Sequence, residues 1–209
     1  MSELIPGCLY RLSGYGEGGH HNSYALINES RQILLVDALL TESFPKISAI
    51  KGLDNLVGVL VSHHHVPAIA KRESIEEFRI RFGSDVPLFL PIADAKQADA
   101  INAIPPMDKW VDPVDSQVLK DFGIETILFP GHTPGHAMYW YPNKKIMLVG
   151  DCAAGPGGTG LEWQGDNWVR PPHMFTSDED LLRKNWASFL PKHGGTFFGG
   201  RPVRSVIPA

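Results

Sequence analysis

Hydrophobic positions in the first part of the chain form short runs separated by polar turns. "SYALINE" (Ser23–Glu29) and "QILLVDALL" (Gln32–Leu40) lie only two residues apart. This spacing predicts a β-hairpin, and its second strand is apolar at nearly every position, which is typical of a strand buried on both faces. "LVGVLVS" (Leu56–Ser62) predicts another buried strand, and a helix is expected before it over Ser43–Ile50. The pattern therefore indicates a β-α-β step after the hairpin.

Helical spacing is clearest over Ala68–Phe82, where four apolar side chains fall on one face with charged residues between them and Gly83 as a stop. "VPLFLP" then predicts a short strand and "DAKQADAIN" a short helix. "IETILFPG" and "HTPGHAMYWYPNKKIMLVGDC" predict further strands, with a turn at Pro142–Lys144. A last helix is expected over Ser177–Phe189, because acidic residues in a first turn suit the helix dipole. "GTFFGGRPV" predicts a final short strand or turn.

The segment Gly155–Pro172 is rich in glycine and proline and has the length of a functional or mobile loop. Trp163 and Trp168, with His173 beside them, predict either a cover over a substrate or packing of the loop onto the body. Together with the alternating strands and helices, the pattern indicates an α/β or α+β sandwich. Periodicity alone does not choose between them.

Composition limits the class of protein. With 209 residues, 43% of them hydrophobic, the chain is expected to form a single domain over residues 1–209. A net charge of -4, a pI near 6.1 and the lack of basic runs favour a small-molecule substrate over nucleic acid or a membrane. No signal segment or bilayer-length apolar run is found, so a cytoplasmic location is expected, while the oligomeric state is left open. Cys8 and Cys152 are too few for a thiolate zinc site, so any metal depends on His and Asp.

The run "VLVSHHHVPAIAK" contains three consecutive histidines after a predicted buried strand. His63 and His65 are two residues apart, so on an extended backbone they point to one side while His64 points away. Two imidazoles on a rigid strand end are half of a site for zinc, iron, nickel or manganese. The alternative is a polar strand end whose imidazoles face water.

Two further clusters carry candidate ligands. In "FPGHTPGHAMYW" a Gly/Pro loop surrounds His132 and His136, and in "IMLVGDCAAG" an apolar strand runs into Asp151. A carboxylate at the end of a buried strand needs a partner or a metal, because an ionised group is costly to remove from water. The alternatives are that Asp151 caps a turn and that His136 is a hydrogen-bonded core residue.

In this order and spacing, the clusters resemble the metallo-β-lactamase superfamily, in particular its glyoxalase-II-like hydrolases. The hairpin is similar to the family's opening hairpin, with Asp37 at its Asp-Thr-Gly aspartate, and "VSHHHVPA" lies where the family has Thr/Ser-His-x-His-x-Asp-His. "PGHTPGH" matches the family loop, "LVGDCAAG" the strand that supplies the bridging aspartate, and "TFFGGRPV" the place of Pro-Gly-His-Gly. The resemblance implies an α/β (α+β) fold, a four-layer αβ/βα sandwich with metals at the sheet edges between its halves.

The resemblance also implies a ligand set. The family's first metal position corresponds to His63, His65 and His132, with Asp151 as the shared ligand, and all four are present. One divalent ion is therefore expected, with zinc as the first choice and iron or manganese as alternatives.

The second metal position would need an Asp at 67 and a His at 68 and 201, whereas this chain has Pro67, Ala68 and Arg201. None of these side chains binds a cation. Arg201 is expected either to enter the vacated space, where it could pair with Asp151 or hold an anionic substrate group, or to lie at the surface. His193 is expected near the end of the last helix, with replacement of the missing ligand at 201 as the alternative.

Three hypotheses about function follow. The first is a single-metal hydrolase of a small ester, thioester, lactone or amide, in which water activated by the ion attacks a carbonyl. The second is a binding module of this fold that has lost catalysis. The third is a mononuclear iron persulfide dioxygenase, whose ligands would correspond to His63, His132 and Asp151, a facial triad.

The catalytic residues are not identified by sequence. Candidate groups are His64, His136 and Arg201, and the replacement bases considered include His20 and His21. The latter two lie in "HHN", just before a strand, where they could line the pocket or face solvent.

Overall fold

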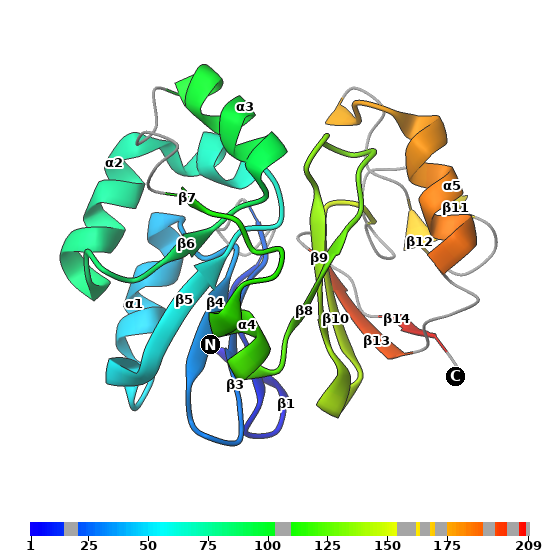
Figure 1. Ribbon diagram of the computed structural model, residues 1–209. Coiled ribbons are helices and arrows are strands. Elements are labelled where there is room, and N and C mark those ends of the chain that lie inside the picture. Colours follow the sequence, from blue (N-terminus) through cyan, green and yellow to red (C-terminus); the bar gives the residue numbers. More distant parts are fainter. Residues whose placement is uncertain are drawn as a thin grey trace.

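In the computed structural model, two β-sheets face each other and helices cover their outer sides (Figure 1). The structure describes residues 1–14, 21–102, 110–153, 162–163, 168–169, 175–189, 195–199 and 205–207. The layers follow the order helix, sheet, sheet, helix, so the predicted four-layer α/β sandwich is confirmed.

The first sheet has seven strands in sequence order, antiparallel from β1 to β4 and parallel from β4 to β7. Helices α1, α2 and α3 lie on its outer side (Figure 1). The bounds are β1 (Ser2–Ile5), β2 (Leu9–Ser13), β3 (Ser23–Ile27), β4 (Ile33–Val36), the 3-10 turn η1 (Thr41–Ser43), α1 (Phe44–Ser48), the 3-10 turn η2 (Leu53–Asn55), β5 (Leu56–Leu60), α2 (His65–Phe82), β6 (Leu88–Phe89), α3 (Ile92–Asn102) and β7 (Trp110–Val111).

The second sheet has five strands in the order β14-β13-β10-β9-β8, and α5 lies on its outer side (Figure 1). Strands β11 and β12 form a separate antiparallel pair. The bounds are α4 (Gln117–Phe122), β8 (Glu125–Leu128), β9 (Ala137–Tyr141), the 3-10 turn η4 (Pro142–Lys144), β10 (Ile146–Gly150), β11 (Glu162–Trp163), β12 (Trp168–Val169), α5 (Glu179–Phe189), β13 (Gly195–Gly199) and β14 (Ser205–Ile207).

Side chains alternate in direction along each strand, which explains why both faces of each sheet are covered. In β4, Leu34 and Val36 join the apolar cluster between the two sheets, whereas Ile33 and Leu35 pack under the helices of the first half. In β10, the side chain of Leu148 faces the first sheet while the neighbouring Met147 and Val149 pack against α5. Successive side chains of a strand point to opposite faces, so strands that are apolar throughout must be covered on both sides.

Most predicted elements are confirmed. Strands β3 and β4 pair as a hairpin, α1 precedes a β5 that is parallel to β4, and η4 turns β9 back onto β10. The other predicted segments each contain or adjoin an observed element, namely β6, α3, β8, α5 and β13. Of the Gly/Pro loop 155–172, the structure describes only β11 and β12. The sequence did not predict α4, which sits between the two halves, or the N-terminal strands.

The strand and helix around the three histidines differ from prediction. Strand β5 ends at Leu60 and helix α2 begins at His65, so the expected extended backbone through the histidines is wrong. The physical reason is a change of hydrogen-bond partner, because the backbone N–H of Ser62 donates to the Asp37 carboxylate and that of His64 to the Asp94 carboxylate. Pro67 is tolerated in the first turn of α2, where backbone N–H groups have no helical partner.

Two residues without glycine's freedom take left-handed backbone angles near this region. Asp37 has φ +51°, which ends β4 four residues before the predicted Leu40. Lys71 has φ +61° and ψ +168°, which interrupts α2 with a kink. Such angles cost a residue that is not glycine about 1–3 kcal/mol.

None of the helices in the described part of the chain is long and apolar enough to span a bilayer. The single domain over residues 1–209 stays a prediction.

Candidate metal centre

Residues from both halves of the sandwich meet at the ends of their strands. His63 comes from the turn between β5 and α2, and His65 is the first residue of α2. His132 comes from the loop between β8 and β9, and Asp151 directly follows β10. One ring nitrogen from each of the three histidines lies within 4.8 Å of the other two. The structure thus brings together the three histidines that the sequence predicts as ligands, although His65 stands in a helix and not on a strand.

The spacing of the histidines fits one ion. His65 Nδ1 lies 3.2 Å from His132 Nε2. With zinc–nitrogen bonds of about 2.0–2.1 Å, two ligands at neighbouring corners of a tetrahedron are about 3.3–3.4 Å apart. The ring of His63 is 5.0 Å from that of His65 and 4.9 Å from that of His132, measured between centroids.

The His63 ring is oriented by a second layer of polar groups. Ser62 Oγ donates to Asp37 Oδ2 at 2.8 Å, so it accepts from His63 Nδ1, which is 2.8 Å away. This bond places the ring proton on Nδ1 and leaves the lone pair on Nε2. His63 Nε2 is buried and has no hydrogen-bond partner among the residues that the structure describes. A buried acceptor without a partner is costly, and a metal ion would satisfy it.

The electrostatic environment keeps the triad neutral. Burial is the largest cause that lowers the pKa of His63 and His65, and it lowers that of His132 to about 3. Neighbouring imidazoles lower these pKa values further. Neutral imidazole is the form that binds metal, so the fold prepares the three rings for coordination before an ion arrives.

Asp151 lies between the triad and a fourth histidine. Its Oδ2 is 3.8 Å from His63 Nε2, and its Oδ1 is 3.1 Å from His21 Nε2. Burial alone would lower the pKa of His21, but the Asp151 carboxylate raises it to about 9. The structure therefore places the predicted shared ligand Asp151 between His63 and His21, beside the group of three histidines and not within it.

Asp94, at the start of α3, holds both ligand-bearing segments. It is fully buried and accepts the backbone N–H of His64 at 2.9 Å, the hydroxyl of Thr133 at 2.6 Å and the backbone N–H of Gly135 at 2.6 Å. Burial alone would raise the pKa of Asp94, but bonds from His64 and Thr133 outweigh burial and lower it. An ionised carboxylate thus ties the β5–α2 turn to the β8–β9 loop.

The candidate bases His64 and His136 lie beside the centre. His64 Nδ1 is 3.3 Å from Asp94 Oδ2 without hydrogen-bond geometry, and the His64 ring also lies against that of His65, at 4.4 Å between centroids. His136 is fully buried, its ring stacks on His63 at 5.2 Å, and burial lowers its pKa to about 4. Within the described part of the chain, neither ring nitrogen of His136 has a hydrogen-bond partner. A catalytic role for either residue stays a prediction.

Other residues singled out in the sequence lie outside the described part of the chain. These are Arg201, His20, His173 and His193, and the side chains of Trp163 and Trp168.

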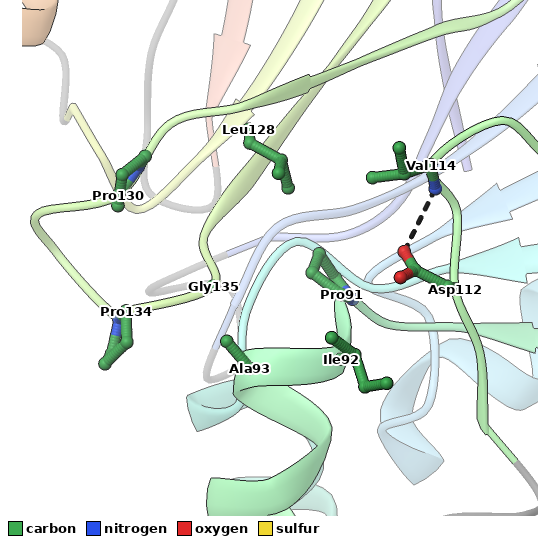
Figure 2. Close-up of a pocket in the computed structure, with 9 residues that line it drawn as sticks. All are labelled: Pro91, Ile92, Ala93, Asp112, Val114, Leu128, Pro130, Pro134 and Gly135. Atoms are coloured by element: carbon green, nitrogen blue, oxygen red, sulfur yellow. Dashed lines mark hydrogen bonds between the residues drawn. The ribbon is translucent and has the colours of Figure 1, made fainter.

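A surface hollow next to the centre is not part of it. Its wall is formed by the start of α3, the end of β8 and the outer side of the β8–β9 loop (Figure 2). Apolar groups dominate its lining, with Asp112 as the charged residue, and none of the triad histidines contributes. The hollow therefore offers no metal chemistry. Its lining residues are Pro91, Ile92, Ala93, Asp112, Val114, Leu128, Pro130, Pro134 and Gly135.

Two polar residues at the centre were missed or undervalued by sequence reasoning. Asp94 lies in the first turn of α3, where an acidic residue is expected to suit the helix dipole, so its sequence position gave no sign of a role at the centre. His21 was expected to face either the pocket or solvent, and the structure buries it against Asp151. No local signal links two residues that are 130 positions apart.

A four-layer sandwich with a histidine cluster at the strand ends defines a class of metal-binding α/β proteins. Residues 68–187, more than half of the chain, match the metallo-beta-lactamase superfamily. The chain belongs to this superfamily, whose members bind divalent metals. The matched range includes His132 and Asp151 and begins just after His65.

Individual relatives agree with this assignment. The chain is 31% identical over 103 residues to a hydroxyacylglutathione hydrolase of Bdellovibrio bacteriovorus, covering 49% of this chain and 37% of the relative. It is 30% identical over 151 residues to one of Mesorhizobium japonicum, covering 71% and 52%. The chain thus spans about half the length of these relatives or less. The BLEG-1 B3 metallo-beta-lactamase structure has a TM-score of 0.65 at 18% identity, covering 95% of this chain and 93% of that one.

Proposed function

We propose that this protein is a hydrolase that uses one divalent ion, zinc by first choice, to cleave an ester, thioester, lactone or amide of a small molecule. The observation that carries this proposal is the convergence of His63, His65 and His132, whose ring nitrogens lie within 4.8 Å of one another, with His65 and His132 at a distance suited to one tetrahedral ion. The buried and unpartnered Nε2 of His63 supports it, because an ion would satisfy that atom.

Two observations support one ion over two. Pro67 and Ala68 stand where the resemblance requires a second set of ligands, and neither side chain can coordinate. Asp151, which bridges two metals in the family pattern, is paired with His21 on one side. The third substituted position, Arg201, lies outside the described residues.

The chain's own residues orient the candidate ligands and bury most of them away from water. Ser62 fixes the tautomer of His63, and Asp94 holds the two ligand-bearing segments in register. A divalent ion bound there would act as a Lewis acid that polarises a carbonyl oxygen and acidifies water. Asp151 Oδ2 lies on the His63 side of the centre, where it can serve as a further ligand or accept a proton from the attacking water.

The relatives favour thioesters as the first substrates to test. Two hydrolases at about 30% identity are named for a glutathione thioester. Because this chain spans about half their length or less, glutathione recognition is not carried over, and simple acyl thioesters, esters and lactones belong in the same panel.

The test is hydrolysis by the purified chain after metal removal and after addition of zinc, iron(II) or manganese(II). Thiol release from acyl thioesters and product release from esters and lactones are followed, with His65→Ala as the matched variant. The proposal expects zinc-dependent turnover that His65→Ala abolishes. Oxygen uptake with iron and a persulfide, without thioester cleavage, would favour the dioxygenase alternative. Metal binding without turnover of any substrate would favour the binding module.

A further inference from the structure

Asp151 is shared between two partners on opposite sides of its carboxylate. Oδ2 faces His63 Nε2 of the proposed metal position at 3.8 Å, and Oδ1 faces His21 Nε2 at 3.1 Å. His21 and Asp151 are both buried, with 2% and 8% of their surfaces exposed. The distance from the His21 ring to the His63 ring is 6.0 Å between centroids, so the second partner adjoins the centre without belonging to the triad.

Both nitrogens of the His21 ring face oxygen acceptors. Nδ1 lies 2.8 Å from the backbone carbonyl oxygen of Asn22, and Nε2 lies 3.1 Å from the Asp151 carboxylate. The ring thus lies between the main chain of its own segment and the carboxylate at the centre, with Nε2 placed to hold Asp151 Oδ1 in position.

The segment that carries His21 is itself held in place. Its backbone carbonyl accepts a hydrogen bond from Ser13 Oγ at 3.0 Å. This bond positions the main chain and leaves the ring contacts untouched. Backbone and ring can therefore be perturbed separately.

We propose that His21 positions Asp151 for the metal centre: it holds one oxygen of the carboxylate and directs the other toward the triad. The proposal rests on the proposed single-metal function. His21 is a positioning residue that acts through Asp151.

The experiment measures metal affinity and coordination in purified variants. Zinc affinity is obtained by competition with a chromophoric chelator, and cobalt(II) is used as a spectroscopic probe of the ligand set. His21→Ala should still bind one equivalent of zinc, but about 10–100-fold more weakly, as expected when a group that orients a ligand is lost. Its cobalt(II) spectrum should also change, because Asp151 is no longer held in place.

Two variants separate positioning from general structure. His21→Gln keeps an N–H donor near the place of Nε2 and should restore most of the affinity and the spectrum. Ser13→Ala loosens the backbone of the same segment and should leave the spectrum unchanged. If His21→Gln behaves like His21→Ala, or if Ser13→Ala changes the spectrum as His21→Ala does, the assigned role is wrong.

A double-mutant cycle tests whether His21 acts through Asp151. In an Asp151→Asn background, the further change His21→Ala should weaken zinc binding by less than threefold. Fully additive losses would overturn the proposal. A wild-type chain that binds no zinc, or binds it without hydrolysis, would defeat the proposed function instead. A hydrolase with one zinc whose His21→Ala variant is unchanged in affinity and spectrum would defeat only the present inference.

Discussion

Replacing Asp94 by asparagine should destabilise the fold and weaken the metal centre together. The carboxylate accepts three hydrogen bonds, from His64 N and Thr133 Oγ on Oδ2 and from Gly135 N on Oδ1. An amide of the same shape has one acceptor oxygen and one donor nitrogen. In either orientation the nitrogen meets at least one donor, so a buried donor loses its acceptor.

The expected cost follows from these contacts. Losing a hydrogen bond to a buried charge costs about 1.5–3 kcal/mol, and a buried unsatisfied donor costs about 1–3 kcal/mol more. The Asp94→Asn variant should therefore lose about 2.5–6 kcal/mol, a large part of the roughly 5–15 kcal/mol that stabilises a typical domain. If that variant fails to fold, Thr133→Val removes one of the three donors and should cost about 1–2 kcal/mol.

The assay is urea unfolding of the metal-free protein, followed by zinc competition on the folded variants. Asp112→Asn is the control, because this exposed aspartate lies close in sequence to the same region and accepts a single hydrogen bond, from Val114. Zinc affinity of a folded Asp94 or Thr133 variant should fall about 10–100-fold. An Asp94→Asn variant as stable as Asp112→Asn, with unchanged zinc affinity, would refute the role assigned to Asp94.

Three further predictions concern the backbone and the pH response. Gly150→Ala should weaken zinc binding and stability, because an added Cβ would lie 2.6 Å from Ser62 Oγ and 2.8 Å from His136 Nε2; an unchanged melting temperature would contradict this. Lys71→Gly should raise the free energy of unfolding by about 1 kcal/mol, since relief of backbone strain exceeds the entropy cost of glycine; a loss measured by urea unfolding would show that the kink is not strained. The metal-free protein should lose stability as pH falls below 6.5, because burial holds the folded-state pKa of His132 near 3 and of His136 near 4, so the unfolded chain takes up protons first. Each histidine contributes up to about 1.4 kcal/mol per pH unit, and flat urea midpoints between pH 6.5 and pH 5 would contradict the assignment.

The sequence was a better guide to the candidate ligand residues than to the backbone conformation around them. Strand ends are where polar side chains gather in such sheets, so His63, His132 and Asp151 could be identified from apolar runs that stop at them. The conformation of the histidine turn could not, because two distant carboxylates, Asp37 and Asp94, capture its backbone N–H groups. The extended-strand argument for His65 was wrong about the backbone, although the structure does bring His65 beside His63 and His132.

Contacts between the two halves could not be predicted from the sequence, and the reason is physical. The pairing of His21 with Asp151 depends on how the two sheets pack, and no periodicity or local motif encodes that packing. Pro67 and Ala68 at the family's ligand positions were visible at once, whereas the contact of His21 with Asp151 became visible only in three dimensions.

The most direct test of the central claim is the metal content of the folded chain. Protein purified without chelator or affinity-tag histidines, and then equilibrated with limiting zinc, should hold one equivalent of metal by elemental analysis. His132→Ala should lose it while remaining folded by circular dichroism, because two histidines and a carboxylate bind the ion more weakly. A wild-type chain that holds no metal, or a His132→Ala variant that keeps the full equivalent, would contradict the assignment of His63, His65 and His132 as the metal centre.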